Sequence, residues 1–134
     1  MVQQKTIAII HREKNLTDAL VAMAQSLGYS PLAMLVDRTT TPQQVSSFVD
    51  RVAPDLVFLA ENYQDYSGGR EGEGIEALIE IRKSHPRDEL PVYMVSGGIY
   101  TQPKEAMQAG ANGYLPIPIG LEQYEHFLKL NLQS

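Results

Sequence analysis

The sequence has no cysteine, which excludes disulfide bonds, thiolate metal sites and a thiol nucleophile. A chain without disulfides suits a reducing compartment. No apolar run approaches the ~18 residues of a membrane-spanning helix. The polar N-terminus also lacks a signal-peptide pattern. We therefore expect a cytoplasmic protein with no membrane contact.

Basic residues are also few, with 11 Lys and Arg against 16 Asp and Glu, giving a net charge of -5. Nucleic acids and anionic membranes are bound by clustered Lys and Arg, so direct contact with either is not expected. The length of 134 residues and the 43% hydrophobic content fit one folded domain over residues 1–134.

Five short apolar runs stand at 6–10, 32–36, 56–60, 92–96 and 113–115. The first, third and fourth are almost continuous, which is typical of strands covered on both faces in a parallel sheet. Helical patterns follow each run. The alternation predicts a doubly wound α/β fold whose five-stranded sheet has the flavodoxin-like order 2-1-3-4-5 and helices on both faces.

Local signals mark where the helices begin and end. Asn15 is the predicted N-cap of the first helix, and Gly28 follows its last turn. Thr41, Pro42 and Gln44 form a predicted capping box at the start of the second helix. The remaining signals are His85-Pro86 after the third helix, Pro103 and Gly110 around the fourth, and an apolar stripe of Leu121, Tyr124, Phe127 and Leu128 on the fifth.

Three segments carry a family resemblance: 7–13 (IAIIHRE), 54–60 (PDLVFLA) and 109–118 (AGANGYLPIP). They resemble, in order, the first strand, the strand leading to the phosphoacceptor and the fifth strand of response regulator receiver domains. The resemblance covers essentially the whole chain. It implies a CheY-like fold and a role in two-component, phosphorelay signal transduction in the bacterial cytoplasm.

The family's reactive groups are missing. Its two metal-binding acidic residues fall on His11 and Arg12, and its phosphoacceptor aspartate falls on Ala60. Mg²⁺ needs several oxygen ligands, and Arg12 is a permanent cation instead. A methyl group cannot accept a phosphoryl group. We therefore predict a degenerate pseudo-receiver that is not an enzyme and has no catalytic residue, metal or cofactor.

Other pocket positions are partly kept. The family's lysine falls on Ile117, whereas Ser96 keeps a hydroxyl and Tyr114 keeps the switch aromatic. Ile117-Pro118 stands where the family commonly has a cis peptide bond. Without phosphorylation, we expect Tyr114 to hold one rotamer.

Two alternatives use the acidic residues or the vacated pocket. Glu61 or Asp65 could be a relocated phosphoacceptor, although we favour Glu61 pairing with Arg12 or staying solvated. The pocket near Ala60, Ser96 and Ile117 could instead hold a small molecule. We interpret His11 as a residue filling the end of a strand rather than as a pH switch.

The segment 63–74 is longer than the family's turn. It is either a surface loop or a binding loop anchored by Tyr63 and Tyr66. Residues 72–77 (GEGIEA) formally fit a dinucleotide fingerprint. They do not directly follow a strand, and their acidic residues would repel a pyrophosphate, so we assign no nucleotide.

The resemblance implies action by protein–protein contact through an output face at 103–109, 112–115 and 121–130. The expected partner is a sensor kinase, another regulator or an adjoining output domain, and a homodimer through the same face is an alternative. The candidate contact residues are Tyr63, Tyr66, Lys104, Gln108 and Tyr124.

Overall fold

The computed structural model describes residues 4–63, 72–95 and 102–132. Three of the sites predicted from the sequence, at Asp65, Tyr66 and Ser96, therefore lie outside the described residues. Among the described residues, no helix combines the length and the apolar character needed to cross a bilayer.

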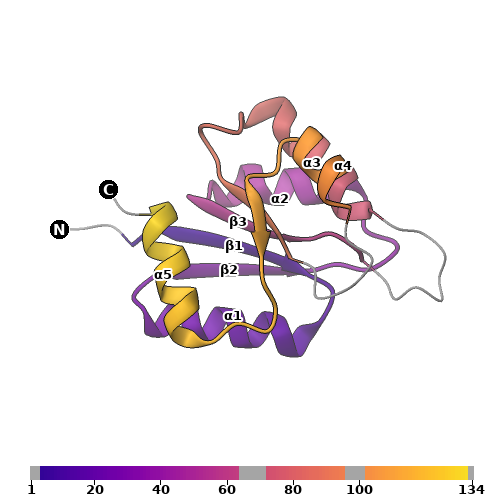
Figure 1. Cartoon of the computed structure of the whole chain (residues 1–134). Helices are drawn as coiled ribbons and strands as arrows, with labels where there is room; N and C mark the ends of the chain where they lie inside the picture. The colour runs from indigo at the N-terminus through magenta and orange to yellow at the C-terminus, as the bar shows by residue number, and fades with distance from the viewer. Residues whose placement is uncertain (1–3, 64–71, 96–101, 133–134) are drawn as a thin grey trace.

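The sheet has five parallel strands in the order β2-β1-β3-β4-β5 (Figure 1). The strands are β1 Thr6–His11, β2 Ser30–Leu35, β3 Leu56–Ala60, β4 Val92–Val95 and β5 Gly113–Leu115. All five residues of the central strand β3 are buried, as its continuous apolar sequence indicates. The predicted fold class and strand order are confirmed.

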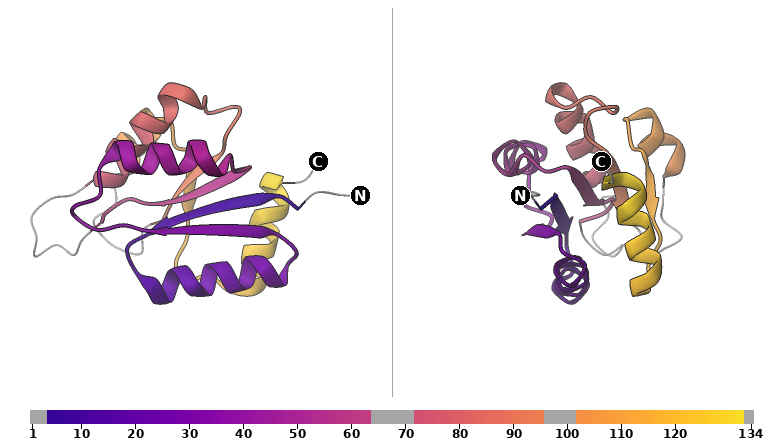
Figure 2. Two further views of the ribbon diagram at one scale, coloured as in Figure 1. Left: turned by 180° about the vertical axis from the view of Figure 1, so that it is seen from behind. Right: turned by 90° about the vertical axis from the view of Figure 1, so that its left-hand side faces the viewer.

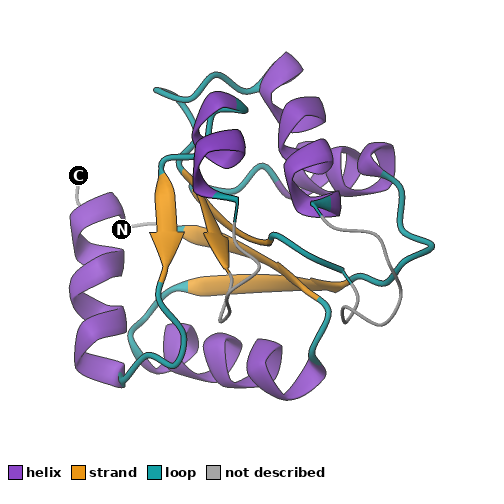
Figure 3. Cartoon of the chain, turned by 45° about the vertical axis from the view of Figure 1, so that its right-hand side comes forward, coloured by secondary structure: helices purple, strands orange, loops and turns teal. Residues whose placement is uncertain are grey.

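Helices cover both faces of the sheet, as Figures 2 and 3 show. Helices α1 Lys14–Ser26 and α5 Leu121–Leu132 lie on one face. Helices α2 Pro42–Val52, α3 Glu73–Ser84 and α4 Pro103–Gln108 lie on the other. This arrangement is the doubly wound layering that the alternation of strands and helices predicts.

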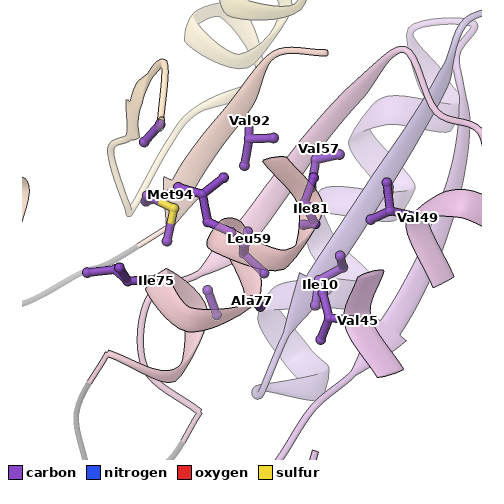
Figure 4. Close-up of a cluster of buried hydrophobic side chains, with 14 of the residues drawn as sticks. Ile10, Val45, Val49, Val57, Leu59, Ile75, Ala77, Ile81, Val92 and Met94 are labelled. Atoms are coloured by element: carbon purple, nitrogen blue, oxygen red, sulfur yellow. The ribbon is translucent and has the colours of Figure 1, made fainter. Parts of the chain in front are cut away.

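Each face has its own hydrophobic core because side chains alternate along a strand. In β1, Ala8 and Ile10 join the first core, under α2 and α3, while Ile7 and Ile9 join the second core, under α1 and α5. Figure 4 shows part of the first core, in which Ile10 and side chains of β3 and β4 meet those of α2 and α3. The sheet is thus fixed between two apolar layers.

The predicted helix ends are confirmed at most positions and wrong at one. The Thr41 side chain accepts a hydrogen bond from the Gln44 amide at 3.1 Å, and the Gln44 side chain accepts one from the Thr41 amide at 2.8 Å. Asn15 is not the N-cap of α1. Glu13 takes that position because its carbonyl already accepts hydrogen bonds from the amide and hydroxyl of Thr17.

Arg82, near the end of α3, connects three segments. Its guanidinium donates to the carbonyls of Gly110, His85 and Leu90 at 2.9, 3.0 and 2.8 Å, and to the Asn112 side chain at 3.0 Å. These contacts hold the turn before β4 and the turn before β5 against α3. Arg82 therefore fixes where β5 begins.

Candidate functional site

The carboxyl ends of β1 and β3 meet at one edge of the sheet because these strands are paired in parallel, with Ile10 opposite Leu59. His11 and Arg12 therefore lie at the same edge as Ala60 and Glu61. This is the edge at which ligands bind in doubly wound folds. The structure thus brings His11 and Arg12 of the first segment to the same edge as Ala60.

His11 is a buried neutral imidazole in this arrangement. Its exposed fraction is 7%, and its Nδ1 accepts a hydrogen bond from the Glu13 amide at 3.0 Å. An accepting Nδ1 carries no proton. Burial lowers the pKa of His11 below its usual 6.5, and the nearby Arg12 adds to this effect while Glu13 opposes it. The geometry supports a residue that fills the strand end.

Arg12 is exposed, and its guanidinium lies 3.9 Å from the carboxylate of its neighbour Glu13. The predicted pairing of Arg12 with Glu61 is wrong. The carboxylate of Glu61 is buried and has other partners, so it is not available to a side chain at the surface.

Ala60 ends β3 with a methyl group that is 1% exposed. The start of α3 lies directly against it: a Cβ added at Gly74 would stand 1.9 Å from the Ala60 carbonyl oxygen. The Gly74 amide also donates to the Glu61 carbonyl at 2.9 Å. Close packing of α3 on the end of β3 therefore explains why residue 74 of the formal dinucleotide pattern is a glycine.

Glu61 is the site residue whose environment differs most from the one expected from the sequence. Its side chain is fully buried, so the expectation of a solvated carboxylate is wrong. One carboxylate oxygen accepts a hydrogen bond from the Gln102 amide at 2.8 Å. The other accepts a hydrogen bond from the Tyr114 hydroxyl. Both partners lie on the side of the first core, against which Tyr114 packs.

Tyr114 lies in β5 and packs against the first core, with its hydroxyl directed at Glu61. Burial raises the pKa of Tyr114, and the hydrogen bond to Glu61 raises it further. The phenol therefore stays protonated and remains a donor at neutral pH.

Tyr63 is not a surface anchor. It is 2% exposed and belongs to the first core, so the prediction that it contacts a partner is wrong. Its hydroxyl has no hydrogen-bond partner in the described part of the chain. Burial, together with the carboxylates of Glu73 and Glu76, raises its pKa. Beside it, the Asn62 side chain accepts from the Gly72 amide at 2.8 Å.

Tyr124, a second candidate contact residue, is also buried. Its side chain is fully enclosed between α5 and the sheet, and its hydroxyl donates to the Leu20 carbonyl of α1 at 3.3 Å. Lys104 and Gln108, by contrast, are exposed on α4. Of the predicted contact residues that the structure describes, these two remain accessible.

Ile117, which the resemblance aligns with the lysine of receiver domains, is partly buried and packs against the second core. The Ile117-Pro118 peptide bond is cis, as the resemblance implies. Ala60 belongs to the first core, so these two residues of the supposed small-molecule pocket contribute to different apolar layers. In the described ranges, no group of three or more His, Asp or Glu residues could hold a metal ion.

The strand order and the placement of the site together define a receiver-like α/β fold. No family model and no curated protein matches the chain. Solved structures do match.

NtrX from Brucella abortus is similar with a TM-score of 0.77 at 23% identity, over 98% of this chain and 27% of that protein. The chain thus spans about a quarter of NtrX. The receiver domain of the sensor histidine kinase PA1611 from Pseudomonas aeruginosa has a TM-score of 0.76 at 20% identity, covering 98% and 100% of the two chains. A two-component response regulator from Clostridium difficile has a TM-score of 0.76 at 21% identity, covering 98% of each chain. This likeness shows the fold of response regulator receiver domains.

Proposed function

We propose that the chain is a signal-transduction module that acts by protein–protein contact and is not phosphorylated in the manner of receiver domains. The buried methyl group of Ala60 is the observation that supports this most strongly. It stands at the end of β3, where the resemblance requires an aspartate. A methyl group has no electron pair with which to attack a phosphoryl group.

The residues of β1 support the same conclusion. The PA1611 receiver domain was solved with a magnesium ion in its active-site cleft. Magnesium is held by oxygen ligands in near-octahedral geometry. Here the corresponding positions carry a neutral imidazole at His11 and a guanidinium at Arg12, which repels a dication.

A relocated acceptor at Glu61 is disfavoured by its surroundings. Both carboxylate oxygens already accept hydrogen bonds, and none of the side chain is exposed. A phosphodonor would have to displace Tyr114 and Gln102 to reach it. The other relocated candidate, Asp65, lies outside the described residues.

We place partner binding on the output face, formed by α4, β5 and α5. Lys104 and Gln108 are exposed there, and the apolar side chains of Met107, Leu121 and Leu130 are 43%, 48% and 70% exposed. Exposed apolar side chains among polar ones are common where proteins bind one another. A sensor kinase, another regulator, an output domain or a second copy of this chain fits such a surface.

The test is capture of partners from the native cell with the immobilised chain, quantified by mass spectrometry. We expect Lys104→Glu with Gln108→Glu to lose the specifically retained proteins, because the changes place negative charge on the output face. The matched control is Lys14→Glu with Gln25→Glu, a lysine and a glutamine exposed on α1. Equal retention by both variants would exclude this face.

A further inference from the structure

We infer that Glu61 is a positioning residue whose buried carboxylate holds Tyr114 and the start of α4 in one arrangement. The inference deepens the proposed function, since Tyr114 and α4 belong to the output face on which that function rests. It concerns how the face is set, and not which partner binds it.

The two hydrogen bonds of Glu61 join segments that are distant in the sequence. Glu61 follows β3, Gln102 immediately precedes α4, and Tyr114 is the middle residue of β5. The contacts span 41 and 53 residues. One carboxylate therefore connects the central strand to two of the three elements that form the output face.

The burial of Glu61 makes these bonds difficult to break. A carboxylate that has no contact with water depends on its protein donors for stabilisation. Rotation of Tyr114 toward solvent, or departure of the Gln102 amide, would leave a buried oxygen without a donor. Both movements are thus opposed by the same buried carboxylate.

The backbone of Glu61 is itself fixed by the start of α3. Its carbonyl accepts from the Gly74 amide at 2.9 Å, and its own amide donates to the Val95 carbonyl at 3.2 Å. Next to it, the Asn62 side chain accepts from the Gly72 amide. The carboxylate is therefore presented from a rigid support, as a residue that positions others must be.

A buried anion that is part of the chain cannot be added or removed, unlike a phosphoryl group. The arrangement of Tyr114 and α4 is consequently permanent unless a partner displaces one of the donors. A partner that binds the output face more tightly when Tyr114 is displaced would have to supply the free energy of those hydrogen bonds.

The experiment measures amide hydrogen exchange and tyrosine ring signals by NMR in the wild type, Glu61→Ala, Glu61→Gln and Tyr114→Phe, without any phosphodonor. We expect amide exchange at Ala106 of α4 and at its C-cap residue Ala109 to rise by about tenfold or more in Glu61→Ala, as for the loss of a hydrogen bond to a charged group. The Tyr114 ring should show one environment in the wild type and a second in Glu61→Ala.

The conservative variant Glu61→Gln keeps the shape of the side chain and one acceptor oxygen. It therefore allows the same exchange and ring measurements if Glu61→Ala does not fold. We expect it to raise α4 exchange less than Glu61→Ala does. A double variant that changes both Glu61 and Tyr114 should have α4 exchange only slightly faster than the faster of the two single variants, because the two changes remove one shared interaction. The exposed Glu13→Gln is the control and should leave α4 unchanged.

Amides of α1 distinguish a local effect from general destabilisation and should keep their wild-type exchange. Unchanged α4 exchange and an unchanged Tyr114 ring in both Glu61 variants would overturn the inference. Phosphorylation of the wild type would overturn the proposed function instead, so the two failures give different results.

Discussion

The hydroxyl of Tyr114 donates a hydrogen bond to the carboxylate of Glu61, so β5 is tied directly to the residue that follows β3. The contact lies between the sheet and the start of α4, where Gln102 completes the set of donors. A carboxylate expected at the surface from sequence is thus an internal connection of the fold. Glu61 directly follows Ala60, whose buried methyl group ends β3.

Replacing Gly74 tests the contact between α3 and the strand end. Gly74→Ala would place a Cβ 1.9 Å from the Ala60 carbonyl oxygen and 2.9 Å from the Cα of Glu61. We expect the free energy of unfolding to fall by at least about 3 kcal/mol, because both obstacles are backbone atoms that cannot rotate away. Chemical denaturation followed by circular dichroism measures it.

Gly120→Ala is the matched control, since nothing lies within 4 Å of its added Cβ. We expect it to change stability by less than about 1 kcal/mol. Equal stabilities of the two alanine variants would show that α3 does not pack on Ala60 as described.

Arg82→Ala removes four hydrogen bonds that join α3 to the turns before β4 and β5. We expect a loss of about 3 kcal/mol in urea denaturation, because three carbonyls and an amide oxygen lose a charged donor. Arg82→Lys should recover little of this, since an ammonium cannot reproduce the planar fork of donors.

The neighbouring exposed Lys83→Ala is the comparison for Arg82. It removes a surface ion pair with Glu80 and should cost no more than about 1 kcal/mol. If Arg82→Ala lowered the free energy of unfolding no more than Lys83→Ala does, the Arg82 guanidinium would not be the group that fixes the start of β5.

The lowered pKa of His11 predicts how stability depends on pH. A histidine kept neutral by burial binds fewer protons when folded, so stability falls as pH drops below the unfolded-state pKa of about 6.5. Above that pH, His11 does not change how the free energy of unfolding depends on pH. We expect the wild type to lose up to about 1.4 kcal/mol per pH unit from this residue below pH 6.5, down to the folded-state pKa.

The variant His11→Gln isolates this effect by its difference from the wild type. It should have a shallower decline between neutral and mildly acid pH in denaturant titrations. Parallel curves for the wild type and His11→Gln would show that His11 is not held neutral.

Local sequence signals were sufficient for most of the fold. The capping box at Thr41 and Gln44 is complete within four residues, and continuous apolar runs marked the buried strands. The cis bond at Pro118 followed from the family resemblance. Two boundaries in the described residues differ from prediction. Strand β2 runs over Ser30–Leu35 instead of 32–36. Helix α1 has Glu13 as its N-cap, because the Glu13 carbonyl accepts the first helical hydrogen bond, although Asn15 has a good capping side chain.

The site was less predictable because its contacts are long-range. Glu61 finds donors 41 and 53 residues away, and no periodicity in the sequence reveals such partners. Tyr63 and Tyr124 were misjudged because tyrosine has an apolar ring and a polar tip, which suits either surface or core. In the structure both tyrosine side chains are buried in the core.

The most direct test of the central claim is intact-protein mass spectrometry after incubation with Mg²⁺ and the small phosphodonor acetyl phosphate. An ordinary receiver domain treated in parallel serves as the positive control. We expect no mass increase of one phosphoryl group in this chain, and no change in the NMR signals of Ala60 or Tyr114. A Mg²⁺-dependent phosphoryl adduct on the wild-type chain would contradict the proposal.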